Sequence, residues 1–408
     1  MGGRGVSSSS KNGVLQLGDL GHLRCPRGGI PEVWAGEWIS LGRHGWTILG
    51  TFLEPITLEE ALSRLSEIAR GQAEFIEVTT VVLRLRERGV LMPVDAGAAA
   101  EHRVDEAYAA PGVHVEMLDD RARVHAFLAA IERVVEGGDV VVELGTGTGV
   151  LAVTAAKAGA KRVIAIEASG ISETARRVIA DNGLGDRVEI VRAWSTGAGL
   201  PEKGDVFVSE MIGHDPFAEG ILELTIDARK RFLSDHASFI PARIILFAVP
   251  VDLPDDVLRK RTFTEDALAG WETEYGIRLS ALGPATADVW ERYLEKPPVV
   301  AAWPWLSRPV QLLKIDLGTV ESPDVDAVAT ITVEREGIAS GAVLFWKAEM
   351  GDGSTLSLDP RKADAANHWL TPVWVNRAGV SAVVGDEIEI SYERRVGRSA
   401  MSLRPRRG

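Results

Sequence analysis

The chain has 408 residues, a formal net charge of −13 and a single cysteine, Cys25. This length allows two or three domains, one cysteine excludes an intramolecular disulfide, and the acidic balance argues against a general nucleic-acid binder. No apolar stretch approaches the roughly 18 residues that a membrane span needs, and residues 1–13 lack the apolar core of a secretory signal, so we expect a cytoplasmic protein with no membrane partner.

The first 94 residues predict a tail followed by a small module. Residues 1–30 are expected to form a disordered tail, and residues 31–94 to form the module. Two strand-like runs open it, over 32–42 and 45–55. The chain is predicted to turn between the two runs, near residues 43–45.

Two helices complete the predicted module. The first begins at Thr57, where Thr57 and Glu60 form the capping box S/T-x-x-E, and the second covers 75–91. The pattern resembles the winged-helix, peptide-recognition domain of enzymes that modify ribosomally made peptides. In that family a leader peptide adds as an extra strand to an exposed edge. A DNA-binding winged helix is the alternative, but the arginines of the second helix have acidic neighbours.

A linker of small residues, 95–112, leads into a domain predicted over 113–241. Its central motif is VVELGTGTG (Val141 to Gly149), where an apolar run stops at Gly145 and a helix-forming run follows Gly149. The glycines therefore lie on a strand-to-helix turn. Such a turn lets a ligand approach backbone N–H groups closely.

A carboxylate follows this turn at a spacing that suits a nucleoside. The next apolar run ends at Glu167, about 20 residues after the turn, where an acid accepts from both hydroxyls of a ribose. The glycines fit neither the dinucleotide spacing nor a phosphate-binding loop with Lys-Ser/Thr. The order of motifs predicts methyl transfer from S-adenosylmethionine.

Two glutamates nine positions apart follow the next apolar strand. Glu210 ends that strand, and Glu219 follows across a glycine-containing segment; we call residues 210–219 the double-Glu loop. Two carboxylates there are suited to grip a cationic amine or guanidinium and to localise its lone pair on the attacking nitrogen. Their mutual repulsion raises the pKa of the pair, so that one is a candidate base. The alternative for Glu219 is a first-turn acid of the following helix.

Beyond Pro241 the pattern turns to alternating strands, which predicts a β-barrel domain over 242–408. The segment 264–309 is too long for an ordinary connection, and we expect it to pack against another subunit. Its tryptophans filling the core of their own domain is the alternative. The predicted strands are 243–251, 310–320, 327–336, 341–350 and 386–395.

Four separated motifs, from about Tyr108 to Trp374, resemble the protein arginine methyltransferase family. They are similar, in order, to the first helix of that family, its cofactor loop with the ribose strand, its double-Glu loop and its Thr-His-Trp loop. A further stretch, WETEYGIRLSAL, resembles the segment that leads into the arm through which these enzymes dimerise, here at about 271–309. In this sequence the four motifs are HVEMLDDRAR (114–123), 143–167, 210–219 and Asn-His-Trp at 367–369.

The resemblance implies an α/β, Rossmann-like S-adenosylmethionine-dependent methyltransferase domain, a β-barrel domain and a homodimer, without a metal. It implies that Arg123 reaches the methionine carboxylate of the cofactor and that Asp120 and His368 meet beneath the substrate; an Arg123 pair with Asp119 is the alternative. The expected catalytic residues are Glu210, Glu219, His368, Asp120 and Tyr108. The expected cofactor-binding residues are His114, Met117, Arg123, Glu143, Gly145, Thr146, Gly147, Glu167, Ala168, Trp194, Ser195 and Glu210.

The double-Glu loop departs from the family pattern. Met211 stands where the family usually has Trp, and His214, Asp215 and Pro216 stand where it has a Tyr and apolar residues. Together with the N-terminal module, this favours an N-methyltransferase that acts on an amine of a leader-bearing ribosomal peptide, as the daptide-type methyltransferases do. A protein arginine N-methyltransferase is the alternative. A cofactor-binding regulator without catalysis is the third class, against which the two glutamates argue.

Overall fold

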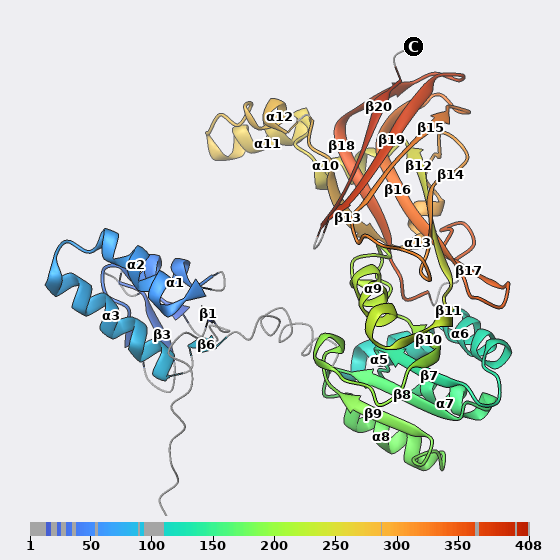
Figure 1. The fold of residues 1–408 in the computed structure, drawn as a ribbon. Helices are drawn as coiled ribbons and strands as arrows, with labels where there is room; N and C mark the ends of the chain where they lie inside the picture. Colours follow the sequence, from blue (N-terminus) through green and yellow to red (C-terminus); the bar gives the residue numbers. More distant parts are fainter. Residues whose placement is uncertain are drawn as a thin grey trace, which may run out of the picture. The chain divides into compact units, whose positions relative to one another are not determined.

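The computed structural model divides the chain into two compact units, Met1–Ala107 and Tyr108–Gly408 (Figure 1). None of the helices in the described ranges is long and apolar enough to cross a bilayer. The residues that the structure describes are 14–17, 23–25, 30–34, 38–53, 56–88, 90–93, 110–286, 288–363, 367–395 and 398–406.

The described residues of the N-terminal unit form two small sheets and three helices around a core of their own. One sheet has the strand order β5-β1-β6 and the other β2-β3-β4, and all pairs are antiparallel. The elements are β1 (Val14–Leu17), β2 (Leu23–Arg24), β3 (Glu32–Trp34), β4 (Trp38–Ser40), α1 (Gly45–Thr51), β5 (Ile56–Thr57), α2 (Leu58–Ile68), α3 (Gln72–Glu87) and β6 (Leu91–Pro93).

Two expectations for this unit were wrong. The predicted tail over 1–30 contains β1 and β2, and Leu15 is 2% exposed because β1 is the central strand of its sheet. The predicted strand over 45–55 is helix α1: buried Gly45, Ile48, Leu49 and Phe52 follow the i, i+3, i+4, i+7 spacing of a helix face. Residues 1–13, 18–22 and 26–29 of the predicted tail, and 95–109 of the predicted linker, lie outside the described residues.

The two predicted helices are present as α2 and α3, but the second ends at Glu87 instead of at 91, and Leu91 lies in β6. Thr57 caps α2: its hydroxyl accepts from the Glu60 N–H at 3.2 Å, and the Glu60 carboxylate accepts from the Thr57 N–H at 3.2 Å. This is the capping box read from the sequence. The winged-helix identity of the unit remains a prediction.

Residues 111–240, here called the parallel-sheet domain, form a five-stranded sheet covered on both faces. The strand order is β11-β10-β7-β8-β9, and every neighbouring pair is parallel. The strands are β7 (Val140–Leu144), β8 (Arg162–Glu167), β9 (Val188–Arg192), β10 (Gly204–Ser209) and β11 (Leu233–Ile240). The helices are α5 (Pro111–Asp119), α6 (Arg121–Val134), α7 (Val150–Ala158), α8 (Ser172–Asp181), η1 (Ser195–Gly197) and α9 (Ile221–Arg231).

Alternate residues of the central strands face the two helical layers. Val141 and Val206 pack into the core that contains residues of α6, α7 and α8, whereas Val142 and Phe207 pack with residues of α9. Because both faces are buried, the strands are continuous apolar runs. The strand order reverses between β7 and β10, and ligands of open α/β sheets bind at the carboxyl edge beside such a reversal.

Residues 243–405, here called the antiparallel domain, form two sheets that share a core with the parallel-sheet domain. One sheet has the order β13-β18-β16-β12-β14, with β17 beside β16, and the other β15-β19-β20. The five predicted strands are confirmed as β12, β14, β15, β16 and β19; closure into a barrel remains a prediction. The strands are β12 (Arg243–Val251), β13 (Glu291–Glu295), β14 (Val310–Asp316), β15 (Val325–Thr332), β16 (Gly337–Glu349), β17 (Thr355–Ser357), β18 (Thr371–Ala382), β19 (Glu387–Arg395) and β20 (Arg398–Pro405).

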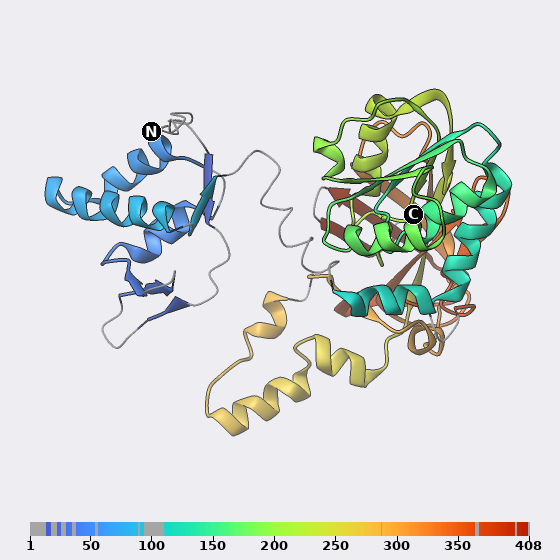
Figure 2. The same ribbon diagram turned by 90° about the horizontal axis from the view of Figure 1, so that it is seen from below.

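Helices α11 (Glu265–Tyr275) and α12 (Leu282–Ala285) project from the antiparallel domain as an arm in both views (Figures 1 and 2), and α10 (Asp255–Arg261), which packs on that domain, leads into the arm. The predicted arm, 271–309, extends too far. Trp303 is 7% exposed in a cluster with Tyr293 and Val300, close to α13 (Pro297–Ala301), so this part belongs to the core of the antiparallel domain. The alternative reading of the tryptophans is therefore the correct one here.

Candidate active site

Three glycines form the turn between β7 and α7. Gly145, Gly147 and Gly149 have φ angles of 76°, 53° and 85°, a conformation that glycine adopts without steric cost. A Cβ atom at Gly145 would lie 2.5 Å from the Sδ atom of Met211, so a side chain at this position would displace the Met211 side chain. The turn therefore allows a ligand to approach the backbone closely at the start of α7.

Glu167 ends β8 and is fixed against this turn. Its Oε2 accepts from the Gly147 N–H at 2.9 Å, and its Oε1 accepts from the Ser169 N–H at 2.8 Å. The side chain is buried. Each carboxylate oxygen has a second lone pair, so the fixed carboxylate keeps the capacity to accept from the hydroxyls of a ribose.

Arg123, in the first turn of α6, is held by groups from two other segments. It forms a partly buried salt bridge with Glu210, and its Nη2 donates to the Met117 carbonyl at 2.6 Å. The alternative pair with Asp119 is therefore not the one formed. The pairing joins α6 to the end of β10, across the point where the strand order reverses.

Two buried polar atoms test whether S-adenosylmethionine suits this site. Within the described ranges, Glu143 Oε1 and Arg123 Nε have no hydrogen-bond partner, although the Thr146 hydroxyl donates to the other Glu143 oxygen at 2.8 Å. Burial raises the pKa of Glu143 to about 8. A spare acceptor and a spare donor match the ammonium and carboxylate of an amino-acid moiety. The residues therefore fit this cofactor.

The double-Glu loop leaves β10 at Glu210 and folds back on itself. A Cβ atom at Gly213 would lie 3.4 Å from the Cγ atom of Glu219, so Glu219 returns beside the first half of the loop. Helix α9 begins at Ile221, and its first-turn acid is Glu223, which excludes that reading of Glu219. Burial raises the pKa of Glu210 to about 8; Arg123 opposes this shift, and Glu219 adds to it.

The structure brings Asp120 and His368 together. Asp120 Oδ1 caps α6 by accepting from the Arg123 N–H at 3.1 Å, and Asp120 Oδ2 accepts from the His368 backbone N–H at 3.0 Å. The His368 imidazole Nδ1 lies 3.7 Å from a Glu116 carboxylate oxygen. Burial lowers the pKa of His368, with Arg123 acting in the same direction.

The remaining expected site residues lie around the same edge. His114 is buried beside Gly147, and a Cβ there would lie 3.5 Å from its ring. Ala168 follows β8, and Trp194 and Ser195 lie at the start of η1, just beyond β9. Tyr108 lies outside the described residues. Their roles in binding or catalysis remain predictions.

Comparison with solved structures identifies this architecture. The Trypanosoma brucei PRMT1 enzyme-prozyme complex with AdoHcy aligns over 73% of this chain and 93% of that chain, with a TM-score of 0.63 and 21% identity. Arabidopsis thaliana protein arginine methyltransferase 10 aligns over 70% and 88%, with a TM-score of 0.59 and 21% identity. The fold is that of the protein arginine methyltransferases.

The sequence matches two family models, one in each domain. Residues 124–246 match the ribosomal protein L11 methyltransferase (PrmA) model, and residues 256–404 match the arginine methyltransferase oligomerization subdomain. The probable protein arginine N-methyltransferase 6 of Arabidopsis thaliana is 33% identical over 226 residues, 54% of this chain and 49% of that protein. Protein arginine N-methyltransferase 1 of Caenorhabditis elegans is 34% identical over 200 residues, 47% of this chain and 56% of that protein. The chain thus spans about half the length of these relatives.

In this methyltransferase fold, the antiparallel domain fixes the double-Glu loop at four places. The Ile212 carbonyl accepts from the Trp369 indole N–H at 2.8 Å, and the His214 Nδ1 accepts from the Leu370 N–H at 3.0 Å. The other two bonds are made by β19. The Tyr392 hydroxyl donates to Asp215 at 3.0 Å, and Arg394 Nη2 donates to the Phe217 carbonyl at 3.2 Å.

Tyr392 and Arg394 were missed by the sequence reasoning, although the sequence carries a signal for them. In β19 the buried positions alternate, and Arg394 falls on the buried face at 4% exposed. An arginine on the buried face of a strand is rarely tolerated unless it is paired. Here it is paired with Glu223 at 2.6 Å, and burial raises the pKa of Tyr392, which keeps its hydroxyl a donor.

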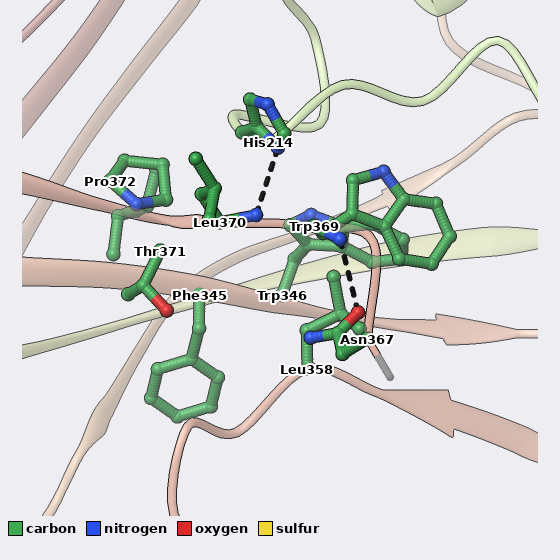
Figure 3. A pocket seen from close by; sticks show the side chains of 10 residues that line it. His214, Phe345, Trp346, Leu358, Asn367, Trp369, Leu370, Thr371 and Pro372 are labelled. Carbon is green, nitrogen blue, oxygen red and sulfur yellow. Dashed lines mark hydrogen bonds between the residues drawn. The ribbon is translucent and has the colours of Figure 1, made fainter. Parts of the chain in front are cut away.

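Figure 3 shows a small cavity under the histidine loop, the name used here for residues 367–370. The residues that line it include His214, Trp346, Leu358 and Trp369. Its volume is about 10 Å³. That is about the room of one water molecule, so the cavity is not an acceptor pocket.

The fit of the turn to a nucleoside cofactor yields a direct prediction. Replacing Glu167 by Ala removes the carboxylate that would accept from a ribose, so we expect S-adenosylhomocysteine binding to weaken by about 1–3 kcal/mol in calorimetry. Glu173→Ala, at an exposed carboxylate on α8, is the control and should leave affinity unchanged. Unchanged binding by Glu167→Ala, or tight binding of NAD by the wild type, would contradict the assignment.

Proposed function

We propose that the chain is an S-adenosylmethionine-dependent N-methyltransferase that methylates the guanidinium group of arginine in a peptide or protein. One observation carries the proposal: Glu210 and Glu219 lie on a fixed loop at the carboxyl edge of the sheet, beside the strand-order reversal. The names and similarity of the Arabidopsis and Caenorhabditis relatives support it.

The residues suit the reaction as follows. When bound, S-adenosylmethionine supplies an electrophilic methyl group on a positively charged sulfur. Glu210 and Glu219 accept hydrogen bonds from the guanidinium, which localises a lone pair on the nitrogen in line with that methyl group. As the new N–C bond forms and the S–C bond breaks, the nitrogen loses a proton to a carboxylate. Burial favours Glu210 as that base, because it raises its pKa to about 8.

The altered loop had favoured an aliphatic amine as the acceptor, and the packing weakens that argument. Asp215 accepts from Tyr392 and lies 3.8 Å from Arg292, so it is buried in contacts with the antiparallel domain. Packing against the antiparallel domain thus explains why Asp215 departs from the family pattern, and a different acceptor is not needed to explain it. Arginine is therefore the acceptor we favour.

A leader-bearing peptide with an acceptor amine is the second candidate. The observation that favours it is the N-terminal unit, which has its own core and is separate from the unit that carries the site. We infer that this unit binds a segment of the substrate, by strand addition in the leader-peptide reading. It would raise the effective concentration of the acceptor at the site.

The proposed role of the two glutamates predicts the effect of their substitution. Glu210→Gln or Glu219→Gln keeps the shape but removes the charge, so turnover should fall by about 10²-fold or more. For Glu219→Gln, S-adenosylhomocysteine affinity should change by less than about threefold, since no cofactor contact is assigned to it. Glu132→Gln, exposed on α6, is the control.

The same groups predict a pH dependence. The ionised form of Glu210 is the one that accepts from the guanidinium, and its pKa is raised to about 8. The specificity constant kcat/KM should therefore rise between pH 7 and 9, and the residual kcat/KM of Glu210→Gln should lack this rise. Wild-type turnover by Glu210→Gln would refute the role.

The choice of acceptor can be tested by competition. Methylation of an arginine-rich tail peptide should exceed that of a peptide with a free aliphatic amine but no arginine.

Deleting residues 1–94 should raise the apparent KM for a long substrate by about 10²-fold or more and leave the KM for a short substrate unchanged. Preference for the amine would establish the second candidate, and equal loss on both lengths would give the N-terminal unit a purely structural role.

The arm and the match to an oligomerization subdomain support a homodimer. Tyr275 and Ile277, at the end of α11, are 58% and 59% exposed. Replacing both by Asp should convert a dimer into a monomer of lower activity in light scattering. Val328→Asp, at a site on β15 that is 63% exposed, is the matched control. A wild-type monomer at micromolar concentration would contradict the assembly.

A further inference from the structure

We propose that His214 is a positioning residue for the methyl-transfer reaction, which it serves by holding the histidine loop (367–370) against the double-Glu loop through an unprotonated Nδ1 atom. The inference rests on the proposed function for its link to turnover. The geometry behind it is independent of that function. It concerns a residue at which this chain departs from the family it resembles.

The hydrogen bond fixes the chemical state of the ring. Leu370 donates its backbone N–H to His214 Nδ1 at 3.0 Å. A backbone N–H is always a donor, so Nδ1 must carry a lone pair, and a neutral ring then has its proton on Nε2. Figure 3 shows the ring above Leu370 with this bond drawn. A protonated imidazole has two N–H donors and would lose the bond.

The surroundings of His214 keep the ring neutral. Burial lowers its pKa to about 4, and the two basic groups that face it, His368 and Arg292, act in the same direction. His368 comes from the histidine loop, with ring centroids 6.2 Å apart, and Arg292 comes from β13. The carboxylate next in the chain, Asp215, accepts from Tyr392. The ring therefore keeps its acceptor atom throughout the neutral pH range.

The bond acts on His368 through the backbone. Leu370 is two residues beyond His368, whose own N–H is held by Asp120 at 3.0 Å. Between them, the Trp369 indole donates to the Ile212 carbonyl at 2.8 Å. Consecutive residues of the histidine loop are thus bound in turn to the cap of α6 and to the double-Glu loop.

The hydrogen bond from Leu370 to His214 thus fixes the C-terminal end of the histidine loop, which carries His368. Without an acceptor at this position, the partly buried Leu370 N–H loses its partner and the histidine loop gains freedom relative to Glu210 and Glu219. The effect on catalysis should appear in kcat, because the bond joins His214 to the histidine loop and not to a residue that is expected to bind the cofactor.

Two substitutions separate the acceptor from the volume of the ring. His214→Asn places a side-chain oxygen near the position of Nδ1, whereas His214→Phe keeps a ring without an acceptor. We expect His214→Phe to lower kcat by about 10²-fold with little change in S-adenosylhomocysteine affinity, and His214→Asn to recover to within about tenfold of wild type. His236→Phe, exposed on β11, is the control. Wild-type kcat in His214→Phe, or equal loss in both variants, would overturn the proposal.

A second measurement does not depend on activity. In the 15N NMR spectrum of protein with labelled histidines, the His214 signal is identified as the one that is absent from His214→Asn. We expect this signal to be that of a neutral ring protonated on Nε2, from pH 7 down to pH 5. A ring protonated on Nδ1, or a ring that titrates near its ordinary pKa, would overturn the proposal. If this signal is as expected but no acceptor is methylated, the proposed function fails and the geometry stands.

Discussion

The site depends on the attachment of the double-Glu loop to two domains at once. At its first residue, Glu210 pairs with Arg123 of the parallel-sheet domain, and from Ile212 to Phe217 four hydrogen bonds tie it to the antiparallel domain. A buried polar group that loses its partner costs about 1–3 kcal/mol, so the loop is costly to displace from either side. The spacing of the two glutamates is therefore fixed by contacts with both domains and not by the double-Glu loop alone.

Burial shapes the charge state of the site in one direction. It raises the pKa of Glu143 and Glu210 and lowers the pKa of His214 and His368, so each group is shifted toward its neutral form. A cationic acceptor that enters beside the carboxylates would reverse part of this shift, because an opposite charge nearby favours ionisation. In the proposed reaction, substrate binding would thereby favour the ionised form of the base.

The sequence was most informative where local rules act alone. The glycine turn, the strand ends at Glu167 and Glu210 and the cap at Thr57 depend on neighbours in the chain, and all were predicted. Helix α1 was read as a strand because seven residues with Ile48 and Leu49 adjacent fit either period until tertiary burial decides. Tyr392 and Arg394 could not be assigned to the site, because each has a partner 177 residues away in the chain.

The connection between the parallel-sheet domain and the antiparallel domain is short. Strand β11 ends at Ile240 and β12 begins at Arg243, and side chains on both sides, among them Phe127 and Leu246, belong to one hydrophobic core. A core of this kind does not divide at a domain boundary. Residues 108–408 should thus behave as one cooperative folding unit, and shortened forms suited to crystallisation or engineering must retain both domains, with boundaries chosen in the linker before α5 rather than at the junction of the two sheets.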